Sequence, residues 1–174
     1  MQRLGGTVVV MERFDPEQFL ALVQRHRITS TQMVPTMFSR LLKLPADVRK
    51  RYDLSSLEVV IHAAAPCPVQ VKEQMIDWWG PVITEAYASS ETGYITFIDS
   101  ADWLAHPGSA GRAVGAARIR ILDESGREMP PGAVGLIYAC QPVTPDFTYL
   151  NNDEARRALE RDGLFTLGDI GTLD

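Results

Sequence analysis

The sequence is poor in cysteine. Its only two cysteines, Cys67 and Cys140, lie far apart in apolar surroundings. A framework of several disulfides, of the kind that holds small secreted domains together, is therefore excluded. We expect two reduced, buried thiols in a cytoplasmic protein. The chain also opens without a cationic segment followed by an apolar one, so we expect no signal peptide.

Long apolar runs and an excess of basic charge are missing too. No run approaches the roughly 20 residues that a bilayer-spanning helix needs, so we expect no transmembrane segment. Lysine and arginine number 17 against 22 acidic residues, which gives a net charge of −5 and a pI near 5.2. This balance argues against a nucleic-acid partner and against binding to acidic membranes through bulk charge. The length of 174 residues is enough to bury a core.

Several well-known site signatures are absent from the sequence. It has no Walker G-x-x-x-x-G-K-[ST] loop, no G-x-G-x-x-G after a strand, no H-E-x-x-H, no paired C-x-x-C and no G-x-S-x-G. P-loop, dinucleotide-binding, zinc-protease and serine-hydrolase sites of these standard types are therefore not expected.

What the first half does contain is an alternation of short apolar runs with amphipathic runs. Asp15-Pro16-Glu17 supplies a helix N-cap, a proline at the first helical position and an acid in the first turn. Alternating strands and helices form βαβ units, so we expect a parallel sheet with right-handed crossovers. The predicted strands are Thr7–Met11, Thr29–Val34, Leu57–Ile61 and Val82–Ala86, and the predicted helices start at Pro16, Pro35 and Pro68.

The pattern changes after about residue 100. Arg118–Leu122 alternates and runs into the turn signal Asp123–Gly126, and a second strand is predicted over Val134–Cys140. These features favour an antiparallel meander or a small barrel. We place the boundary near residue 110.

The expected fold class is α/β: part of a parallel βαβ sheet over residues 1–110, followed by part of a small antiparallel β-barrel subdomain over residues 111–174. Both ends of the chain are abrupt. Four strands are few for a parallel sheet, and the run Gly163–Gly171 leads to Asp174 without a closing element. The sequence therefore suggests a piece of a larger protein.

Polar residues gather at Tyr87–Glu91, directly after the fourth predicted strand. Ligands of open parallel sheets bind beyond the carboxyl ends of strands. Glu91 could hold Mg²⁺, which typically takes one or two carboxylates together with phosphate oxygens and water. Ser90 could donate to a phosphate and Tyr87 could offer a flat face to a base. From these residues alone, a surface loop that hydrogen-bonds only to water is the plainer explanation.

Two other polar residues are candidates for a site. Asp169 could accept hydrogen bonds from a ribose diol, or could be an ordinary turn aspartate. His62 stands where the third predicted strand ends, where a lone histidine is more often a neutral wall residue than a base or a ligand.

Four segments together resemble the adenylate-forming (AMP-binding) superfamily, which includes acyl-CoA synthetases, amino-acid adenylation domains and firefly luciferase. They occur in the family's order and the similarity covers essentially the whole chain. Gln32–Phe38 resembles the segment lining the acyl pocket, Ala63–Pro66 the Gly-Gly-Ala-Pro turn beside adenine, Tyr87–Glu91 the motif Tyr-Gly-x-Thr-Glu, and Leu167–Asp169 the motif Thr/Ser-Gly-Asp.

This resemblance implies an AMP-forming acid–CoA ligase. In such an enzyme a carboxylate attacks the α-phosphorus of ATP and expels pyrophosphate, and the thiol of CoA then displaces AMP. The implied cofactors and co-substrates are ATP/AMP, Mg²⁺ and CoA. The uncharged pocket segment implies an apolar acid, fatty, sterol-like or aromatic, and counts against amino acids.

The resemblance also implies roles for individual residues. Tyr87 would pack against adenine, and Asp169 would take the ribose hydroxyls. Ser90 and Glu91 would be catalytic, Ser90 at the α-phosphate and Glu91 at the metal. In full, the implied nucleotide-binding residues are Ala64, Ala65, Pro66, Tyr87, Ala88, Ser89, Ser90 and Asp169, and the implied substrate pocket is Met33, Val34, Pro35, His62 and Ala63.

The sequence departs from the family pattern in several places. Ala63, Ala64 and Ala88 stand where glycines are common, and each disfavours a positive φ. Leu167 replaces a hydroxyl residue. The family's phosphate loop would precede Met1, and its hinge and lysine-bearing domain would follow the last residue, so we expect the chain alone to be inactive.

Two alternatives stay open. The first is an adenylating enzyme with a different acceptor, such as an amino-acid or aryl-acid loading domain. The second is a non-catalytic nucleotide-binding remnant, or an interaction module, that keeps the fold without turnover.

Overall fold

The computed structural model describes residues 5–174. The chain divides into two compact units, one formed by Met1–Glu85 with Asp99–Ser109 and the other by Ala86–Ile98 with Ala110–Asp174. In the described part of the chain, no helix is both long enough and apolar enough to cross a bilayer.

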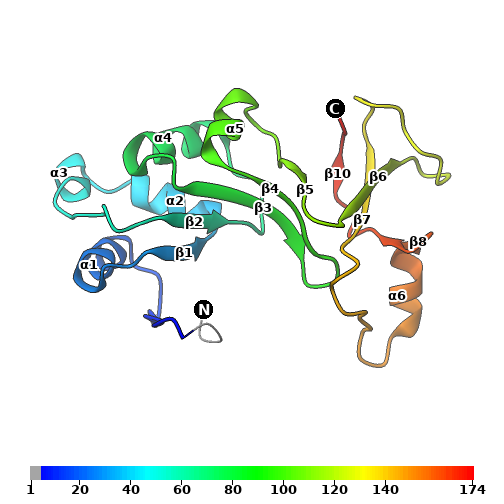
Figure 1. Ribbon diagram of the computed structural model, residues 1–174, viewed down its shortest axis with the longest axis horizontal. Helices are drawn as coiled ribbons and strands as arrows, with labels where there is room; N and C mark the ends of the chain where they lie inside the picture. Colours follow the sequence, from blue (N-terminus) through cyan, green and yellow to red (C-terminus); the bar gives the residue numbers. More distant parts are fainter. Residues whose placement is uncertain (1–4) are drawn as a thin grey trace. The chain divides into compact units, whose positions relative to one another are not determined.

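Parallel strands form the centre of the first unit. β1 pairs with β2, and β2 pairs with the first half of β3, both in parallel (Figure 1). This pairing confirms the predicted parallel sheet with helical crossovers. The elements are α1 (Pro16–His26), β1 (Ser30–Met33), α2 (Pro35–Leu42), α3 (Ala46–Arg49), β2 (Val59–His62), α4 (Val69–Trp79), the first part of β3 (Ile83–Ser89) and α5 (Ser100–Ala105).

Helix α1 begins where its sequence predicts. The Asp15 side chain accepts a hydrogen bond of 2.8 Å from the amide of Gln18, and Pro16 occupies the first helical position. The helix stops at Arg27, which adopts a left-handed conformation with φ 49°. Asp15 therefore satisfies one of the amides that every helix leaves without an internal partner.

The core of the first unit lies between the helices and the parallel strands. Ser100 of α5 also ties that helix to β3, because its hydroxyl donates to the carbonyl of Ile83 at 2.7 Å and accepts from the same residue's amide at 3.1 Å. The fully buried apolar side chains of this unit are Leu20, Val23, Met33, Phe38, Leu41, Val60, Met75, Ile83 and Trp103.

The strand predicted over Thr7–Met11 is wrong. This segment has no regular structure, and Val8 and Val10 are 46% and 81% exposed. Its β-branched residues tolerate an extended backbone, but a strand needs a neighbour to complete its ladder of hydrogen bonds. Among residues 5–174 no strand pairs with it.

The second unit contains an antiparallel sheet built around β7, which confirms the predicted antiparallel half. β7 pairs with the whole of β6, and also with β10 and β9. Over the described residues this sheet stays open and does not close into a barrel. The elements are the end of β3, β4 (Gly93–Ile98), β5 (Arg112–Ala113), β6 (Arg118–Leu122), β7 (Gly135–Cys140), α6 (Asp153–Leu159), β8 (Glu160–Arg161), β9 (Leu164–Phe165) and β10 (Ile170–Gly171).

Gly111 allows β4 and β5 to approach each other. Its φ is +88°, and a Cβ at this position would lie 2.1 Å from the carbonyl oxygen of Phe97. Only glycine can combine this positive φ with so close an approach to the Phe97 carbonyl without displacing the neighbouring backbone.

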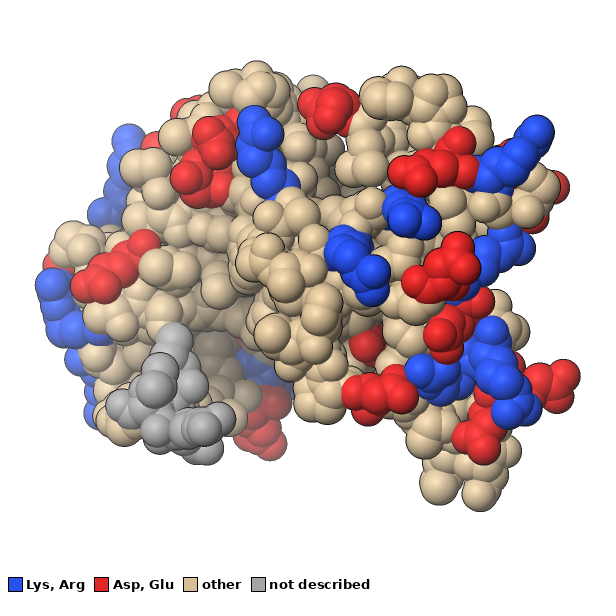
Figure 2. All heavy atoms as spheres, turned by 45° about the vertical axis from the view of Figure 1, so that its right-hand side comes forward, with Lys and Arg blue, Asp and Glu red and all other residues tan. Residues whose placement is uncertain are grey.

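Charges of the two signs are mixed on the face of the protein that Figure 2 shows. On the face shown in Figure 2, lysine and arginine side chains alternate with aspartate and glutamate, and no broad field of one sign forms. This arrangement agrees with the small net charge of −5.

Candidate active site

The segment Tyr87–Glu91 lies on the end of β3 and in the tight turn that leads into β4. The hydroxyl of Ser89 accepts hydrogen bonds from the amides of Glu91 and Thr92, at 3.2 and 2.9 Å, and lies 2.8 Å from the Thr92 hydroxyl. Ser89 therefore fixes the turn in the way that serine commonly does in short loops. Ser90 is exposed at the tip.

Glu91 is partly buried and has a specific partner. The hydroxyl of Tyr149 donates a hydrogen bond to Glu91 Oε1 at 2.9 Å, from 58 residues further along the chain. This hydrogen bond is the main cause of a raised pKa of Tyr149. Nothing in the sequence pattern points to this contact, because it joins two loops.

Tyr87 and Asp169, the residues expected at adenine and at ribose, are brought together. The Tyr87 hydroxyl donates to Asp169 Oδ2 at 2.7 Å. Burial first, and the hydrogen bond to Asp169 second, raise the pKa of Tyr87, so its phenol remains protonated and serves as a donor.

The turn that carries Asp169 is fixed by the backbone. The amide of Ile137 in β7 donates to the Asp169 carbonyl at 2.9 Å, and the amide of Gly168 donates to the Thr166 hydroxyl at 3.2 Å. Gly168 has a φ of +88°, a conformation that suits glycine. Leu167 is 39% exposed.

The turn after β2 holds the alanines that resemble the adenine-side motif. Ala64, Ala65 and Pro66 are exposed and Ala63 is buried. Ala64 adopts a φ of 73°, in the left-handed region where the family pattern has a glycine. A left-handed backbone is unfavourable for alanine, so this position carries some strain that a glycine would not.

The residues expected to line the acyl pocket surround the ends of β1 and β2. Met33 pairs in register with His62, and both are buried. Val34 is the N-cap of α2 and Pro35 its first residue. The structure thus groups these residues, while a role in substrate binding stays a prediction.

His62 belongs to a buried polar cluster with Glu85 and Lys72. Lys72 Nζ lies 2.6 Å from Glu85 Oε2 and 4.6 Å from the centre of the Trp103 ring. His62 Nε2 lies 3.4 Å from the same carboxylate oxygen without the geometry of a hydrogen bond, so both imidazole nitrogens are buried without a hydrogen-bond partner in the described structure.

Burial acts against the charged forms of both Lys72 and Glu85. It lowers the pKa of Lys72 despite the bond to Glu85. Burial alone would raise the pKa of Glu85, but His62 and Lys72 outweigh it and lower that pKa below its ordinary value. The sequence did carry a signal for Lys72, because this residue falls on the same helical stripe as Met75, Ile76 and Trp79.

A small cleft of about 190 Å³ opens beside Glu91 in the second unit. Its walls bring together the opposite charges of Glu91 and Arg118 with the amide of Gln141, which donates to the carbonyls of Tyr94 and Val114 at 3.3 and 3.0 Å.

Glu91 offers the kind of oxygen ligand that Mg²⁺ takes, and a metal ion at this carboxylate stays a prediction. Among residues 5–174 no group of three or more histidine, cysteine, aspartate or glutamate side chains could hold an ion. Tyr149 occupies Oε1 of Glu91 and leaves Oε2 available. One carboxylate oxygen suits Mg²⁺, which keeps several waters and takes further ligands from phosphates.

Comparisons with known proteins identify the family of the chain. The profile of the family described as AMP-binding enzyme matches residues 1–144. FadD8 of Mycobacterium tuberculosis, a medium/long-chain-fatty-acid–CoA ligase, is 35% identical over 173 residues, covering 98% of this chain and 30% of that protein. An indoleacetate–CoA ligase of Aromatoleum aromaticum is 31% identical over 171 residues, covering 98% of this chain and 33% of that protein. The chain thus spans about a third of the length of these relatives.

Solved structures with the same fold include two adenylate-forming enzymes. The amide bond synthetase McbA from Marinactinospora thermotolerans matches with a TM-score of 0.85 at 28% identity, over 94% of this chain and 34% of that one. The o-succinylbenzoate CoA synthetase of Bacillus subtilis, solved with the acyl-adenylate intermediate OSB-AMP, matches with a TM-score of 0.82 at 26% identity, over 98% of this chain and 34% of that one. On the family match and these likenesses together, the chain belongs to the family of AMP-binding enzymes.

Proposed function

We propose that the polypeptide carrying these residues is an AMP-forming acid–CoA ligase. It adenylates a carboxylic acid with ATP and then transfers the acyl group to CoA. The observation that carries this proposal is the hydrogen bond of 2.7 Å between Tyr87, the residue expected at the adenine, and Asp169, the residue expected at the ribose. Family membership and the CoA ligases among the relatives support it.

The residues of the second unit supply the contacts to ATP. Tyr87 offers its ring to adenine while its hydroxyl orients Asp169, whose other oxygen, Oδ1, accepts from the ribose hydroxyls. Ser90, exposed at the tip of the turn, donates to the α-phosphate. Glu91 Oε2 holds Mg²⁺, which when bound offsets the repulsion between the incoming carboxylate and the phosphates.

The acid is proposed to be apolar, either fatty, sterol-like or aromatic. Met33, Val34 and Pro35 are uncharged, and the charges of Lys72 and Glu85 beside His62 are already paired with each other. The fatty-acid and indoleacetate specificities in the names of the two relatives support an apolar acid here.

A second candidate is an adenylating enzyme that transfers the acyl group to another acceptor. The likeness to an amide bond synthetase favours it. Adenylation is common to both candidates, so the acceptor alone distinguishes them. A cytoplasmic location remains a prediction.

Acid-dependent exchange of pyrophosphate into ATP tests the adenylation step. The assay uses the native polypeptide, meaning the polypeptide that contains residues 1–174 at the length its host cell produces. A series of fatty, aromatic and sterol-like acids is supplied without CoA. Exchange with an apolar acid, followed by CoA-dependent release of AMP, is the expected result. Exchange without any response to CoA would favour the second candidate, and nucleotide binding without exchange would indicate a non-catalytic remnant.

A further inference from the structure

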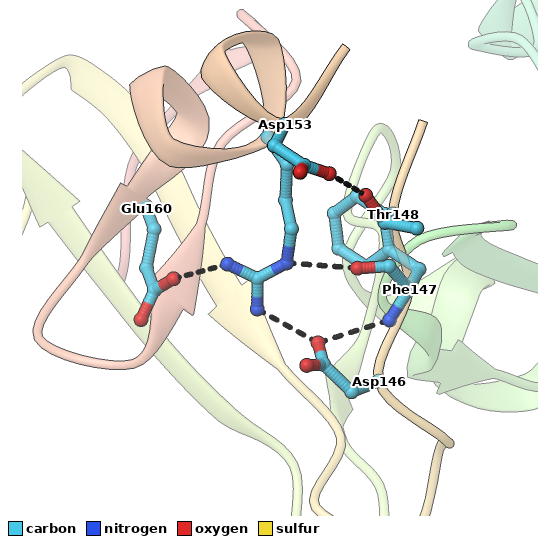
Figure 3. Close-up of polar contacts among 6 residues, drawn as sticks. Asp146, Phe147, Thr148, Asp153 and Glu160 are labelled. Carbon is cyan, nitrogen blue, oxygen red and sulfur yellow. Dashed lines mark hydrogen bonds and ion pairs between the residues drawn. The ribbon is translucent and has the colours of Figure 1, made fainter. Parts of the chain in front are cut away.

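Arg156 of α6 holds the loop that precedes Tyr149. Its guanidinium donates through Nε to the Phe147 carbonyl at 2.8 Å and through Nη2 to Asp146 Oδ1 at 2.7 Å (Figure 3). Nη1 donates to Glu160 Oε2 at 2.5 Å. All three guanidinium nitrogens are therefore used, two of them on the loop, in a way that the single ammonium of a lysine could not reproduce.

Aromatic rings enclose the same guanidinium. Its central carbon lies 5.4 Å from the centre of the Phe147 ring and 5.0 Å from that of Phe165, and these two rings meet edge to face at 5.1 Å. The Arg156 side chain is 19% exposed. An isolated surface ion pair would contribute little to stability. The Arg156 guanidinium, by contrast, is held in one orientation by several hydrogen bonds and two aromatic rings.

A second bond fixes the loop to the start of α6. The Thr148 hydroxyl donates to Asp153 Oδ1 at 2.7 Å, as Figure 3 shows. Tyr149 follows immediately, with its ring 5.6 Å from that of Phe147 and its hydroxyl on Glu91 Oε1. The contacts are thus continuous from α6 through the loop to Glu91.

We propose that Arg156 and Tyr149 are positioning residues for Glu91. Arg156 fixes the loop Asp146–Thr148, and Tyr149 at the end of that loop holds one carboxylate oxygen so that the other faces the cation. The inference rests on the proposed function, because it concerns the carboxylate assigned to Mg²⁺ there. It adds two residues to which no role at the nucleotide had been given.

The physical reason lies in the freedom of a glutamate side chain. A glutamate at the edge of a short turn has several rotamers of similar energy, and fixing one on ligand binding costs conformational entropy. The Tyr149 bond selects a rotamer before the cation arrives. Tyr149 can do this only while its own loop is ordered, which is the part played by Arg156.

The test measures how much Mg²⁺ strengthens nucleotide binding to the native polypeptide. Affinity for α,β-methylene-ATP, which cannot be cleaved at the reacting bond, is measured by calorimetry with saturating Mg²⁺ and again with EDTA. The ratio of the two affinities is the Mg²⁺ gain. A general loss of stability would not change this ratio selectively.

The variants are Tyr149→Phe, which keeps the ring and removes only the hydroxyl, Arg156→Ala, and the two combined. Arg157→Ala is the matched control, because Arg157 is the exposed neighbour on the same helix. We expect each single variant to reduce the Mg²⁺ gain about tenfold, the scale of one hydrogen bond to a charged group. Affinity in EDTA should change less than about twofold. Arg157→Ala should match the wild type.

The double variant tests whether the two residues act in series. If they do, it should lose no more than either single variant, whereas independent effects would multiply. A full Mg²⁺ gain in Tyr149→Phe, or multiplied losses in the double variant, would overturn the inference while leaving the proposed function intact. A wild type that binds no nucleotide, or gains nothing from Mg²⁺, would overturn the assignment of Glu91 and this inference with it.

Discussion

The hydroxyl of Tyr87 donates a hydrogen bond to Asp169 across 2.7 Å and joins residues 82 positions apart. One oxygen of the carboxylate is therefore already in use, and the other is the one that can accept from a ribose. At the proposed nucleotide site Tyr87 would therefore have two tasks, stacking on adenine through its ring and orienting Asp169 through its hydroxyl.

Replacing Asp169 should remove recognition of the ribose hydroxyls. We expect Asp169→Ala in the native polypeptide to weaken AMP binding about tenfold or more, because at least one charge-assisted hydrogen bond is lost. The wild type should also bind 2′,3′-dideoxy-ATP more weakly than ATP, and the variant should lose most of that preference. Calorimetry gives both affinities, after the variant's melting temperature has shown it to be folded. An unchanged ratio of ATP to dideoxy-ATP affinity would make Asp169 an ordinary turn residue.

Replacing Glu91 should impair chemistry more than acid binding. Glu91→Gln keeps the shape of the side chain and removes the charge, so we expect the rate of acid-dependent pyrophosphate exchange to fall by about 10²–10³. The half-saturating acid concentration should change little. The exchange assay at saturating ATP supplies both values, and a loss below about threefold would show that Glu91 is not the metal-side carboxylate.

The Glu85–Lys72 pair should respond strongly to the loss of one partner. Glu85→Gln leaves the ammonium of Lys72, which is 0% exposed, without its counter-charge. Such a change typically costs about 3–5 kcal/mol. Urea unfolding measures the difference in unfolding free energy. The control Asp77→Asn, on an exposed position of the same helix, should lie within about 0.5 kcal/mol of the wild type. Equal midpoints for the two variants would show that the pair adds nothing to stability.

The Glu85–Lys72 pair also predicts the direction in which the stability of the protein changes with pH. The pKa of Glu85 in the folded protein lies below its ordinary value of 4.5 because of His62 and Lys72, which offset the effect of burial. The folded state thus binds this proton less readily than the unfolded state. The contribution to stability is present above pH 4.5 and is lost as the pH falls through the lowered pKa. Urea midpoints measured from pH 7 down to pH 3 should fall less steeply in Glu85→Gln than in the wild type, and parallel curves would contradict this assignment.

Gly111 and Gly108 form a matched pair for backbone strain. Both have a strongly positive φ, +88° and +90°, but a Cβ at Gly111 would meet the Phe97 carbonyl while a Cβ at Gly108 would meet nothing within 4 Å. Gly108→Ala should cost about 1–2 kcal/mol for the left-handed conformation. Gly111→Ala should cost about 1–3 kcal/mol more, because of the clash. Urea unfolding of the two variants compares these costs. Equal losses of unfolding free energy would mean that β4 and β5 can move apart at Gly111 without an energetic cost.

Local signals allowed much of the fold to be predicted. The cap at Asp15 and the prolines that open α1 and α2 act within a few residues, and these elements appear where expected. The strand predicted over Thr7–Met11 was wrong because a strand needs a neighbouring strand to pair with, and the residues of the run do not specify that neighbour. β4 was not predicted, since Gly93–Ile98 mixes polar and apolar residues without a clear alternation.

Contacts in the candidate site could be predicted less well. The family resemblance pointed to Tyr87, Glu91 and Asp169 one by one, but not to the hydrogen bonds that they make, Tyr87 with Asp169 and Glu91 with Tyr149. The bond from Tyr149 to Glu91 spans 58 residues, and a sequence pattern carries no signal for a pairing between loops at such separation. The roles of these residues toward a ligand remain predictions.

Ala64 has a consequence for the thermodynamics of any ligand that reaches the turn after β2. An alanine at a φ of 73° is held where a glycine would be relaxed, and Pro66 and Pro68 restrict the same short turn. The fixed φ of the two prolines reduces the number of backbone states open to the unbound turn. A ligand that binds there would therefore order little additional backbone. The entropy lost on binding would come mainly from the ligand and from ordered water, because folding has already ordered this turn.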